Sequence, residues 1–269
     1  MGTRHPFDEA LVLEPRTPQR VSGHTSEAYW NMVGPYGGIT AAAMLQAMLD
    51  RPERQGEPLS FTINYLAPIA AGEFAIETEL VRANRSNQHW TIRLLQGDAG
   101  DEKTLALAIA ICAQRREVWS HVDARRPDVP PPDACPPAPP RRAEGFLLRY
   151  QFRPVRGLPF AENPDSHSEA WVQDVPPRPL DFASLTAICD SFLPRIFLRR
   201  REFTPIGTVS MNIYFHAGGE ELARHGDAPL LTVADGQAFS DGHFDHNGLV
   251  WSRHGELLAS THQLVWYKE

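Results

Sequence analysis

Several side chains of this sequence could take part in catalysis or ligand binding, and each also has a purely structural interpretation. Asp190 could serve as a base, or it could be a solvated carboxylate near the end of a helix. Gln263 stands in a mostly apolar strand, where a buried amide needs hydrogen-bonding partners. His243, Asp245 and His246 carry groups that bind zinc or iron, but a polar hairpin loop has the same composition. We favour the loop for these three residues and expect no metal site.

The three cysteines indicate a redox environment rather than a catalytic group. Cys112, Cys135 and Cys189 are too few for a disulfide framework, so we expect reduced thiols in the cytoplasm. Cys189 is expected to pack in the core, because a nucleophilic role would need a nearby His. The Walker A, Rossmann, zinc-finger and calcium-loop patterns are missing from the sequence, and we expect no cofactor.

The composition argues against two classes of partner. Of the 269 residues, 42% are hydrophobic and 22% are charged, as in ordinary globular proteins. The 33 acidic side chains outnumber the 26 basic ones, and the net charge of −7 argues against a nucleic-acid-binding surface. The sequence holds no run of 18 apolar residues, so we expect no membrane span. The first residues also lack the apolar core of a signal peptide.

A proline-rich stretch divides the chain into two halves. Eight of the fourteen residues in 127–140 are proline. Proline lacks a backbone N–H and has a fixed φ, so this stretch can form neither a helix nor a central strand. We predict an N-terminal domain over 1–124, an extended linker over 125–142 and a C-terminal domain over 143–269. A ligand for an SH3-type domain is the alternative interpretation of the linker.

Each half is predicted to be a helix followed by a meander of strands. Residues 39–50, after a glycine-rich turn, are apolar nearly all round, which is typical of a buried helix. In the second half, Asp181 is a plausible N-cap for a helix over 182–192. Apolar alternation and β-branched residues predict the strands: 59–65, 73–82, 88–96 and 104–115 in the first half, and 147–152, 169–173, 208–216, 230–238, 248–253 and 257–267 in the second.

The strand that follows each helix is similar in the two halves. Residues 61–66 can be placed against 209–214 at a shift of 148, and Gln114 against Gln263 at a shift of 149. A nearly constant offset is what a gene duplication would leave. Strict alternation in this second-half strand predicts that Thr208 faces away from Val209.

Three segments resemble the double hot-dog acyl-CoA thioesterases, the type II bacterial enzymes and their peroxisomal relatives. They are 34–38 before the first helix, 208–216, which is like the family's Thr strand, and 255–263, which is close to the signature Asp-Gly-x-Leu-x-Ala-Ser-x-x-Gln. The resemblance implies an α+β tandem hot-dog fold. In that fold two antiparallel sheets, each wrapped around a helix, are joined edge to edge.

The resemblance also implies a site and a substrate. The family uses an Asp on the second-half helix, a Thr or Ser on the next strand and a Gln on the last strand, which correspond here to Asp190, Thr208 and Gln263. Thr62 stands where many members carry His, so a His base at that position is not expected. The implied partner is a fatty acyl-CoA substrate. Relatives often assemble further, which leaves a homo-oligomer as an open expectation.

Hydrolysis of a thioester requires a water molecule that is held and deprotonated. On the predicted helix, Asp190 shares a face with Ala183, Thr186 and Ala187, whose small side chains leave room for water. Burial would raise the pKa of the Asp190 carboxylate toward the working pH. The expected acyl site is an apolar tunnel between the two halves.

The other implied residues would orient the water and stabilise the transition state. Thr208 and Gln263 can each donate and accept hydrogen bonds, so both can hold the same water. Direct attack by that water needs no acyl-enzyme. Gly37 and Gly38 open the first helix, whose N-terminal N–H groups would bind the substrate oxyanion.

Two other functions are compatible with the predicted fold. A non-catalytic acyl-CoA or lipid-binding protein would keep the fold without the chemistry. A hot-dog hydratase or dehydratase generally uses a His with an Asp or Glu around the helix, and neither predicted helix contains His. The segment 237–246 also departs from the thioesterase pattern.

Overall fold

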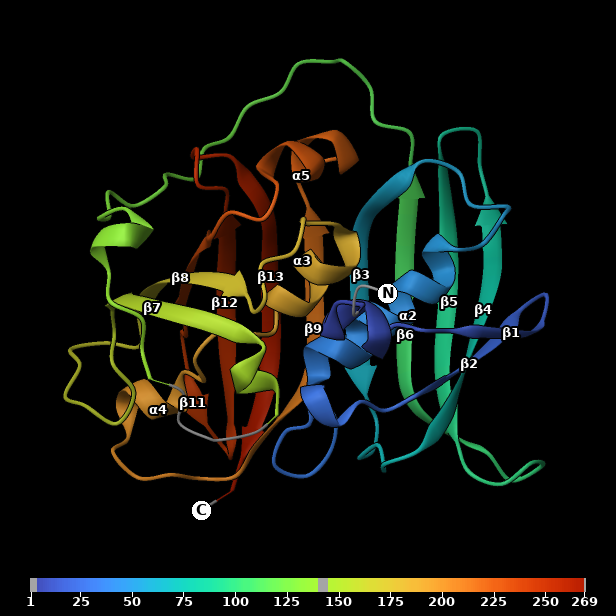
Figure 1. Cartoon of the computed structure of the whole chain (residues 1–269), viewed down its shortest axis with the longest axis horizontal. Helices are drawn as coiled ribbons and strands as arrows, with labels where there is room; N and C mark the ends of the chain where they lie inside the picture. The colour runs from blue at the N-terminus through green and yellow to red at the C-terminus, as the bar shows by residue number, and fades with distance from the viewer. Residues whose placement is uncertain (1–3, 140–144, 269) are drawn as a thin grey trace.

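The computed structural model describes residues 4–139 and 145–268. Among these residues, one sheet of thirteen strands runs through both halves, in the order β1-β2-β4-β5-β6-β3-β9-β13-β12-β10-β8-β7, with β11 paired to β12. Every strand pairing in the sheet is antiparallel. Figure 1 shows the helices α2 and α3 next to each other in front of this sheet.

The first half contains the predicted helix and all four predicted strands. Its elements are α1 (Pro6–Ala10), β1 (Glu14–Thr17), β2 (Arg20–His24), η1 (Glu27–Tyr29), α2 (Gly37–Leu49), β3 (Glu57–Tyr65), β4 (Glu73–Ala83), β5 (Asn87–Gln96) and β6 (Lys103–Ala113). The segments α1, β1, β2 and η1 were not predicted, because each is too short to show a clear period.

The second half repeats the plan with more short elements. They are η2 (Pro132–Ala134), η3 (Phe146–Leu148), β7 (Tyr150–Arg156), β8 (Ser168–Asp174), α3 (Phe182–Ile188), α4 (Ile196–Arg199), β9 (Ile206–Phe215), α5 (Gly219–His225), β10 (Leu230–Asp235), β11 (Phe239–Ser240), β12 (His243–Trp251) and β13 (Leu257–Tyr267). The strand β12 begins five residues earlier than predicted. His243, Asp245 and His246 therefore lie in a strand, and their interpretation as a loop was wrong.

The two halves are joined through their first long strands. β3 pairs with β9, with Phe61 opposite Ile213, and the Asn212 Nδ2 donates to Thr62 Oγ1 at 2.6 Å. The predicted edge-to-edge sheet is confirmed. Next to this seam, Arg115 donates to the backbone carbonyls of Phe215, His216 and Ala217, so a side chain of the first half binds the end of β9.

The helix α2 is buried on nearly every side. Ten of its thirteen residues are buried, among them Thr40, Ala41, Ala42 and Met44. Its alanines are small enough for both the sheet and α3 to pack closely against it. This helix and the two inner sheet faces form the main hydrophobic core.

The helix α3 is shorter than predicted and ends at Ile188. Asp181 caps its N-terminus, as predicted, by accepting a hydrogen bond from the Ser184 N–H. At the other end, the Ser191 N–H and Ser191 Oγ both bond to the Ile188 carbonyl. These local bonds replace the helical ones and turn the chain out of the helix.

The segment between the two meanders packs partly against the second half. Residues 114–131 contain neither helix nor strand, and the end of the predicted linker, 140–142, lies outside the described residues. The Trp171 indole donates to the Pro130 carbonyl at 2.9 Å. Val129 and Cys135 join Trp171 and Trp251 in a small apolar cluster on the sheet face away from α3. Figure 1 shows the segment arching from β6 across the top of the molecule.

Candidate active site

Asp190 lies in the turn after α3, two residues beyond the last helical residue. It does not share a helix face with Ala183 and Ala187, as we predicted, because the helix ends first. The turn instead directs the Asp190 carboxylate at the N-terminus of α2. A Cβ atom built on Gly37 would lie 2.7 Å from Asp190 Oδ2. The base predicted in one half therefore meets a glycine of the other half.

Gln263 holds this turn and the carboxylate together. Its side chain is 4% exposed on the inner face of β13. The Nε2 group donates to the Cys189 carbonyl at 3.0 Å and to Asp190 Oδ1 at 3.2 Å. It also lies 3.4 Å from the Met211 sulfur. These contacts supply the partners that a buried amide in an apolar strand requires.

Thr208 reaches the site because of a bulge in β9. Ser210 pairs with Leu264 and Thr208 pairs with Val265, which leaves Val209 as an extra residue. Leu264 is 41% exposed and Val265 is 4% exposed, so Thr208 faces inward with Val265. Our prediction of strict alternation was wrong here, because one inserted residue reverses the direction of the next side chain. The Thr208 hydroxyl is close enough to the Asp190 carboxylate to act on it as a donor and lower its pKa.

The N-terminus of α2 completes the surroundings of the carboxylate. The N-cap residue Tyr36 makes no side-chain capping bond, and the Gly38 N–H acts as a donor toward the Asp190 carboxylate and lowers its pKa. Asp190 thus acts as the missing cap acceptor for α2, at the end where the helix dipole favours negative charge. A Cβ atom on Gly38 would lie 2.6 Å from the Ala187 carbonyl oxygen, so the close approach of α2 to α3 requires glycine.

The environment of Asp190 raises its pKa from an ordinary 3.8 to about 7. Burial in the protein is the largest cause, since it disfavours the charged form. Hydrogen bonds from Gly38, Gln263 and Thr208 act in the opposite direction and lower the pKa. The side chain lies deep among protein atoms but keeps partial contact with solvent. Such a carboxyl group can accept or release a proton near neutral pH.

The other candidate groups do not gather around a common point. His243 is exposed and His246 is buried, so they face opposite sides of β12, and Asp245 accepts from the Gln237 and Ala238 N–H groups. Across the described ranges 4–139 and 145–268, no cluster of His, Cys, Asp and Glu could hold a metal ion. Burial raises the pKa of the Cys189 thiol, which opposes its use as a nucleophile.

Tyr65 is the residue near the site that the sequence analysis missed. It ends the predicted strand 59–65, where apolar residues alternate with polar ones, and it faces inward with Phe61 and Ile63. Its hydroxyl donates to the Gly37 carbonyl at 2.8 Å. The sequence did contain a sign of this contact. Tyr65 is the last of the inward-facing side chains on its strand, and a buried tyrosine hydroxyl usually needs a hydrogen-bonding partner.

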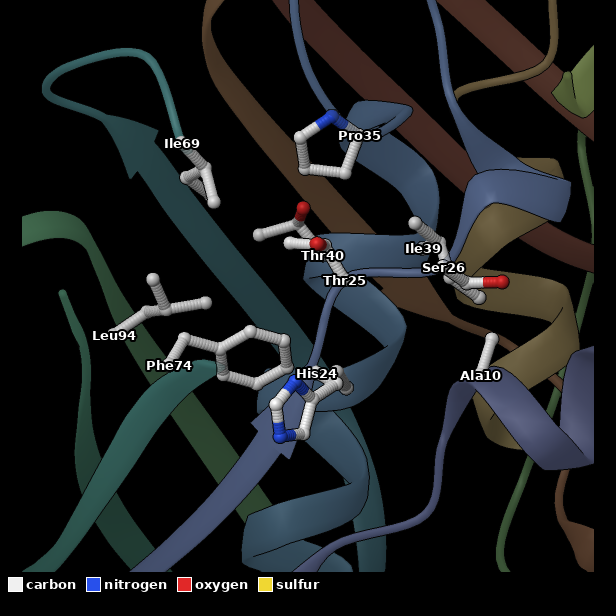
Figure 2. Close-up of a pocket in the computed structure, with 11 residues that line it drawn as sticks. Ala10, His24, Thr25, Ser26, Pro35, Ile39, Thr40, Ile69, Phe74 and Leu94 are labelled. Carbon is white, nitrogen blue, oxygen red and sulfur yellow. The ribbon is translucent and has the colours of Figure 1, made fainter. Parts of the chain in front are cut away.

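A pocket lies beside α2 within the first half, not between the halves as expected for the acyl tunnel. Its volume is about 300 Å³, including space open to solvent. Figure 2 shows Phe74 and Leu94 from the strands on one side, Ile39 on the helix, and Ile69 and Pro35 near the same opening. The walls are mostly apolar, with His24, Thr25, Ser26 and Thr40 as polar exceptions.

Comparison with models of known protein families shows which family this fold and these site residues belong to. Residues 26–113 match the model of the acyl-CoA thioesterase N-terminal domain, and residues 132–267 match that of the C-terminal domain. The chain belongs to the acyl-CoA thioesterase family. The match to the N-terminal domain of these thioesterases includes Gly37 and Gly38, and the match to their C-terminal domain includes Asp190, Thr208 and Gln263.

Solved structures show the same hot-dog fold in relatives of this acyl-CoA thioesterase family member. A hot-dog protein of unknown function from Alicyclobacillus acidocaldarius is 43% identical, with a TM-score of 0.95 and 99% of each chain covered. Acyl-CoA thioesterase II TesB2 from Mycobacterium marinum is 20% identical, with a TM-score of 0.78 and with 97% of this chain and 98% of that chain covered.

A dehydratase is also similar in fold. The dehydratase domain of RzxB from Pseudomonas fluorescens is 14% identical, with a TM-score of 0.61 and with 99% of this chain and 100% of that chain covered. No curated protein matches the chain. Similarity at such low identity shows the double hot-dog fold alone. The chemistry has to be inferred from the residues at the site.

Proposed function

We propose that this protein hydrolyses fatty acyl-CoA thioesters by direct attack of water. One observation supports the proposal above all others. Thr208 and Gln263 both act as donors to the Asp190 carboxylate, although the three residues are far apart in the sequence. The raised pKa of that carboxylate suits a general base at neutral pH.

In the proposed reaction, Asp190 takes a proton from water while the water oxygen attacks the thioester carbon. Thr208 and Gln263 hold the water beside the carboxylate. The oxyanion forms near the N-terminus of α2, and we assign the Gly37 N–H to it because the Gly38 N–H already binds Asp190. The carbon–sulfur bond then breaks, and the CoA thiolate takes the proton from Asp190. The products are a fatty acid and free CoA.

The decisive experiment is an assay of thioester hydrolysis with acyl-CoAs of graded chain length. We expect turnover by the wild-type protein and a loss of about 100- to 10,000-fold in kcat for Asp190→Asn, the usual contribution of a positioned base. A folded wild-type protein without turnover on any chain length would remove the enzymatic proposal. Binding of a non-hydrolysable CoA thioether by such an inactive protein would select the acyl-CoA-binding function instead.

The dehydratase alternative is not supported by the site. The helices α2 and α3 contain no His, and the carboxylate at the site is surrounded by Gln, Thr and Gly donors. Likeness in fold to a dehydratase domain does not supply the missing imidazole.

We further propose that the acyl chain occupies the pocket beside α2. Pro35 and Ile39 line this pocket and flank Gly37 and Gly38 in the sequence, which supports a path from the reacting carbonyl into it. Ile69→Trp would narrow the opening, so kcat/KM should fall more for long acyl chains than for short ones. Leu66→Trp is the matched control, because Leu66 lies on the same loop, is 56% exposed and does not line the pocket.

The buried cysteines and the exposed apolar side chains support two further proposals, a cytoplasmic location and a homo-oligomer. The cysteines are all free and buried, which supports a reducing, cytoplasmic location. Ile109, Tyr214 and Leu264 are exposed on the strands at the seam, which supports association with a second copy of the chain. A monomeric mass by light scattering would contradict the proposed association.

A further inference from the structure

The peptide group between Gly37 and Gly38 connects two hydrogen bonds that point in opposite directions. Its carbonyl oxygen accepts from the Tyr65 hydroxyl at 2.8 Å. Its N–H group acts as a donor that lowers the pKa of the Asp190 carboxylate, whose Oδ2 would lie 2.7 Å from a Cβ atom on Gly37. The C=O and N–H of one trans peptide are rigidly coplanar, so fixing one of them fixes the direction of the other.

Tyr65 and Asp190 approach this peptide group from different halves of the chain. Tyr65 ends β3, and Asp190 follows α3. A Cβ atom on Gly37 would lie 3.2 Å from the Tyr65 hydroxyl and 2.7 Å from Asp190 Oδ2. Both oxygens therefore lie beside the same backbone atom, and the glycine leaves the space that lets them approach.

The two glycines need such an anchor. Glycine is the most conformationally permissive residue, so two at the start of a helix make its first turn easier to distort than other residues would. The first N–H groups of a helix also lack partners within the helix. The first turn of α2 already holds the Gly37 carbonyl, and the hydrogen bond from Tyr65 adds a second constraint that keeps the Gly38 N–H directed at the carboxylate.

We propose that Tyr65 is a positioning residue for Asp190, acting through the Gly37–Gly38 peptide group. This inference deepens the proposed function and rests on Asp190 as its base. The bond to the carbonyl also polarises the peptide, which makes the Gly38 N–H a stronger donor, because hydrogen bonds in a chain strengthen one another.

Other titratable groups around Asp190 stay neutral near pH 7. The hydroxyls of Tyr36, Tyr65 and Tyr150 and the thiol of Cys189 are buried near its charge, and both effects raise their pKa values. Asp190 is therefore the group in this cluster whose ionisation changes near neutrality. A shift in the pH profile would report on its surroundings directly.

The test is Tyr65→Phe, which removes the hydroxyl and keeps the ring. We expect kcat to fall by about tenfold, KM to stay nearly constant, and the pKa of Asp190 to rise by about half a unit, because the carboxylate loses part of its best backbone donor. Tyr214→Phe is the control, since Tyr214 is 55% exposed on the opposite sheet face. A Tyr65→Phe protein with the wild-type pH profile and kcat would overturn the inference.

Two further measurements keep the inference separate from the proposed function. Titration of the Asp190 carboxyl by carbon NMR gives its pKa without any turnover, so the effect of Tyr65 is measurable even if the protein is not a thioesterase. Replacing Tyr65 by 3-fluorotyrosine retains the ring and makes the hydroxyl a stronger donor. The pKa of Asp190 should then fall, and an unchanged value would contradict the proposed coupling.

Discussion

At the scale of single residues, Asp190 combines two opposing demands. A buried carboxylate is costly when charged, and the three donors around it reduce that cost only in part. The family resemblance predicted Asp190 and Gln263 as site residues, but the sequence could not reveal the pKa of Asp190. That value depends on Gly38, which is 152 positions before Asp190 in the chain and adjacent to it only after folding.

The first prediction concerns the pH dependence of activity. The proposed base works only when Asp190 is ionised, and its pKa is about 7. We therefore expect kcat to increase with pH through about 7 and to level off above it. Rates measured from pH 5.5 to 8.5 at saturating acyl-CoA would show this step, and a flat profile would contradict the assignment of the base.

The second prediction concerns stability. The native state holds the Asp190 proton more tightly than the unfolded chain, whose Asp pKa is about 3.9. Stability from this group is therefore complete below about pH 4 and is lost as pH rises through about 7. Asp190→Asn cannot ionise, so its melting temperature should exceed that of the wild type more at pH 8 than at pH 4. A difference that does not vary with pH would contradict the raised pKa.

At the scale of elements, the bulge in β9 determines which side chain reaches the site. The long elements, α2, β3 to β6, β9 and β13, could be predicted because each carries a clear period over many residues. The bulge could not, since Val209 fits an alternating strand as well as a bulged one. The early end of α3 was missed for a similar reason, because the deciding bonds of Ser191 are local and have no period.

The third prediction tests this bulge. Thr208→Val should lower kcat by about tenfold or more and raise the pKa of Asp190, because the carboxylate loses a donor. Ser210→Ala should have little effect, since Ser210 pairs with the outward-facing Leu264. Steady-state kinetics of the two variants would decide. Equal losses of kcat in Thr208→Val and Ser210→Ala would show that the two side chains face the same side, as in a strand without the bulge.

At the scale of the whole molecule, the site belongs to neither half alone. Asp190, Thr208 and Gln263 come from the second half, whereas Gly37, Gly38 and Tyr65 come from the first. The seam between β3 and β9 therefore holds the proposed catalytic groups in register as well as closing the sheet edges. The sequence predicted the fused sheet only through the family resemblance, because strand order across halves leaves no local signal.

The fourth prediction concerns Arg115, which connects the halves beside this seam. Its guanidinium binds Glu57 and three carbonyls at the end of β9, so Arg115→Ala leaves several acceptors without a donor. We expect a loss of about 1–3 kcal/mol in the free energy of unfolding. Urea denaturation would measure it, with Arg224→Ala as the control for a mostly exposed ion pair. Equal midpoints for both variants would contradict a role for Arg115 at the seam.

The apolar cluster of Val129, Cys135, Trp171 and Trp251 makes the two halves unequal despite their common plan. The proline-rich segment covers only part of the outer sheet face of the second half, because Tyr214 and Leu264 near the seam stay exposed, as do Val81 and Ile109 on the first half. We therefore expect the proposed contact with a second copy to centre on the seam strands, away from the proline-rich segment. If both copies use this same patch, the proposed pairing closes after two chains and gives no continuing stack, so the covered part of the sheet would confine self-association to a dimer.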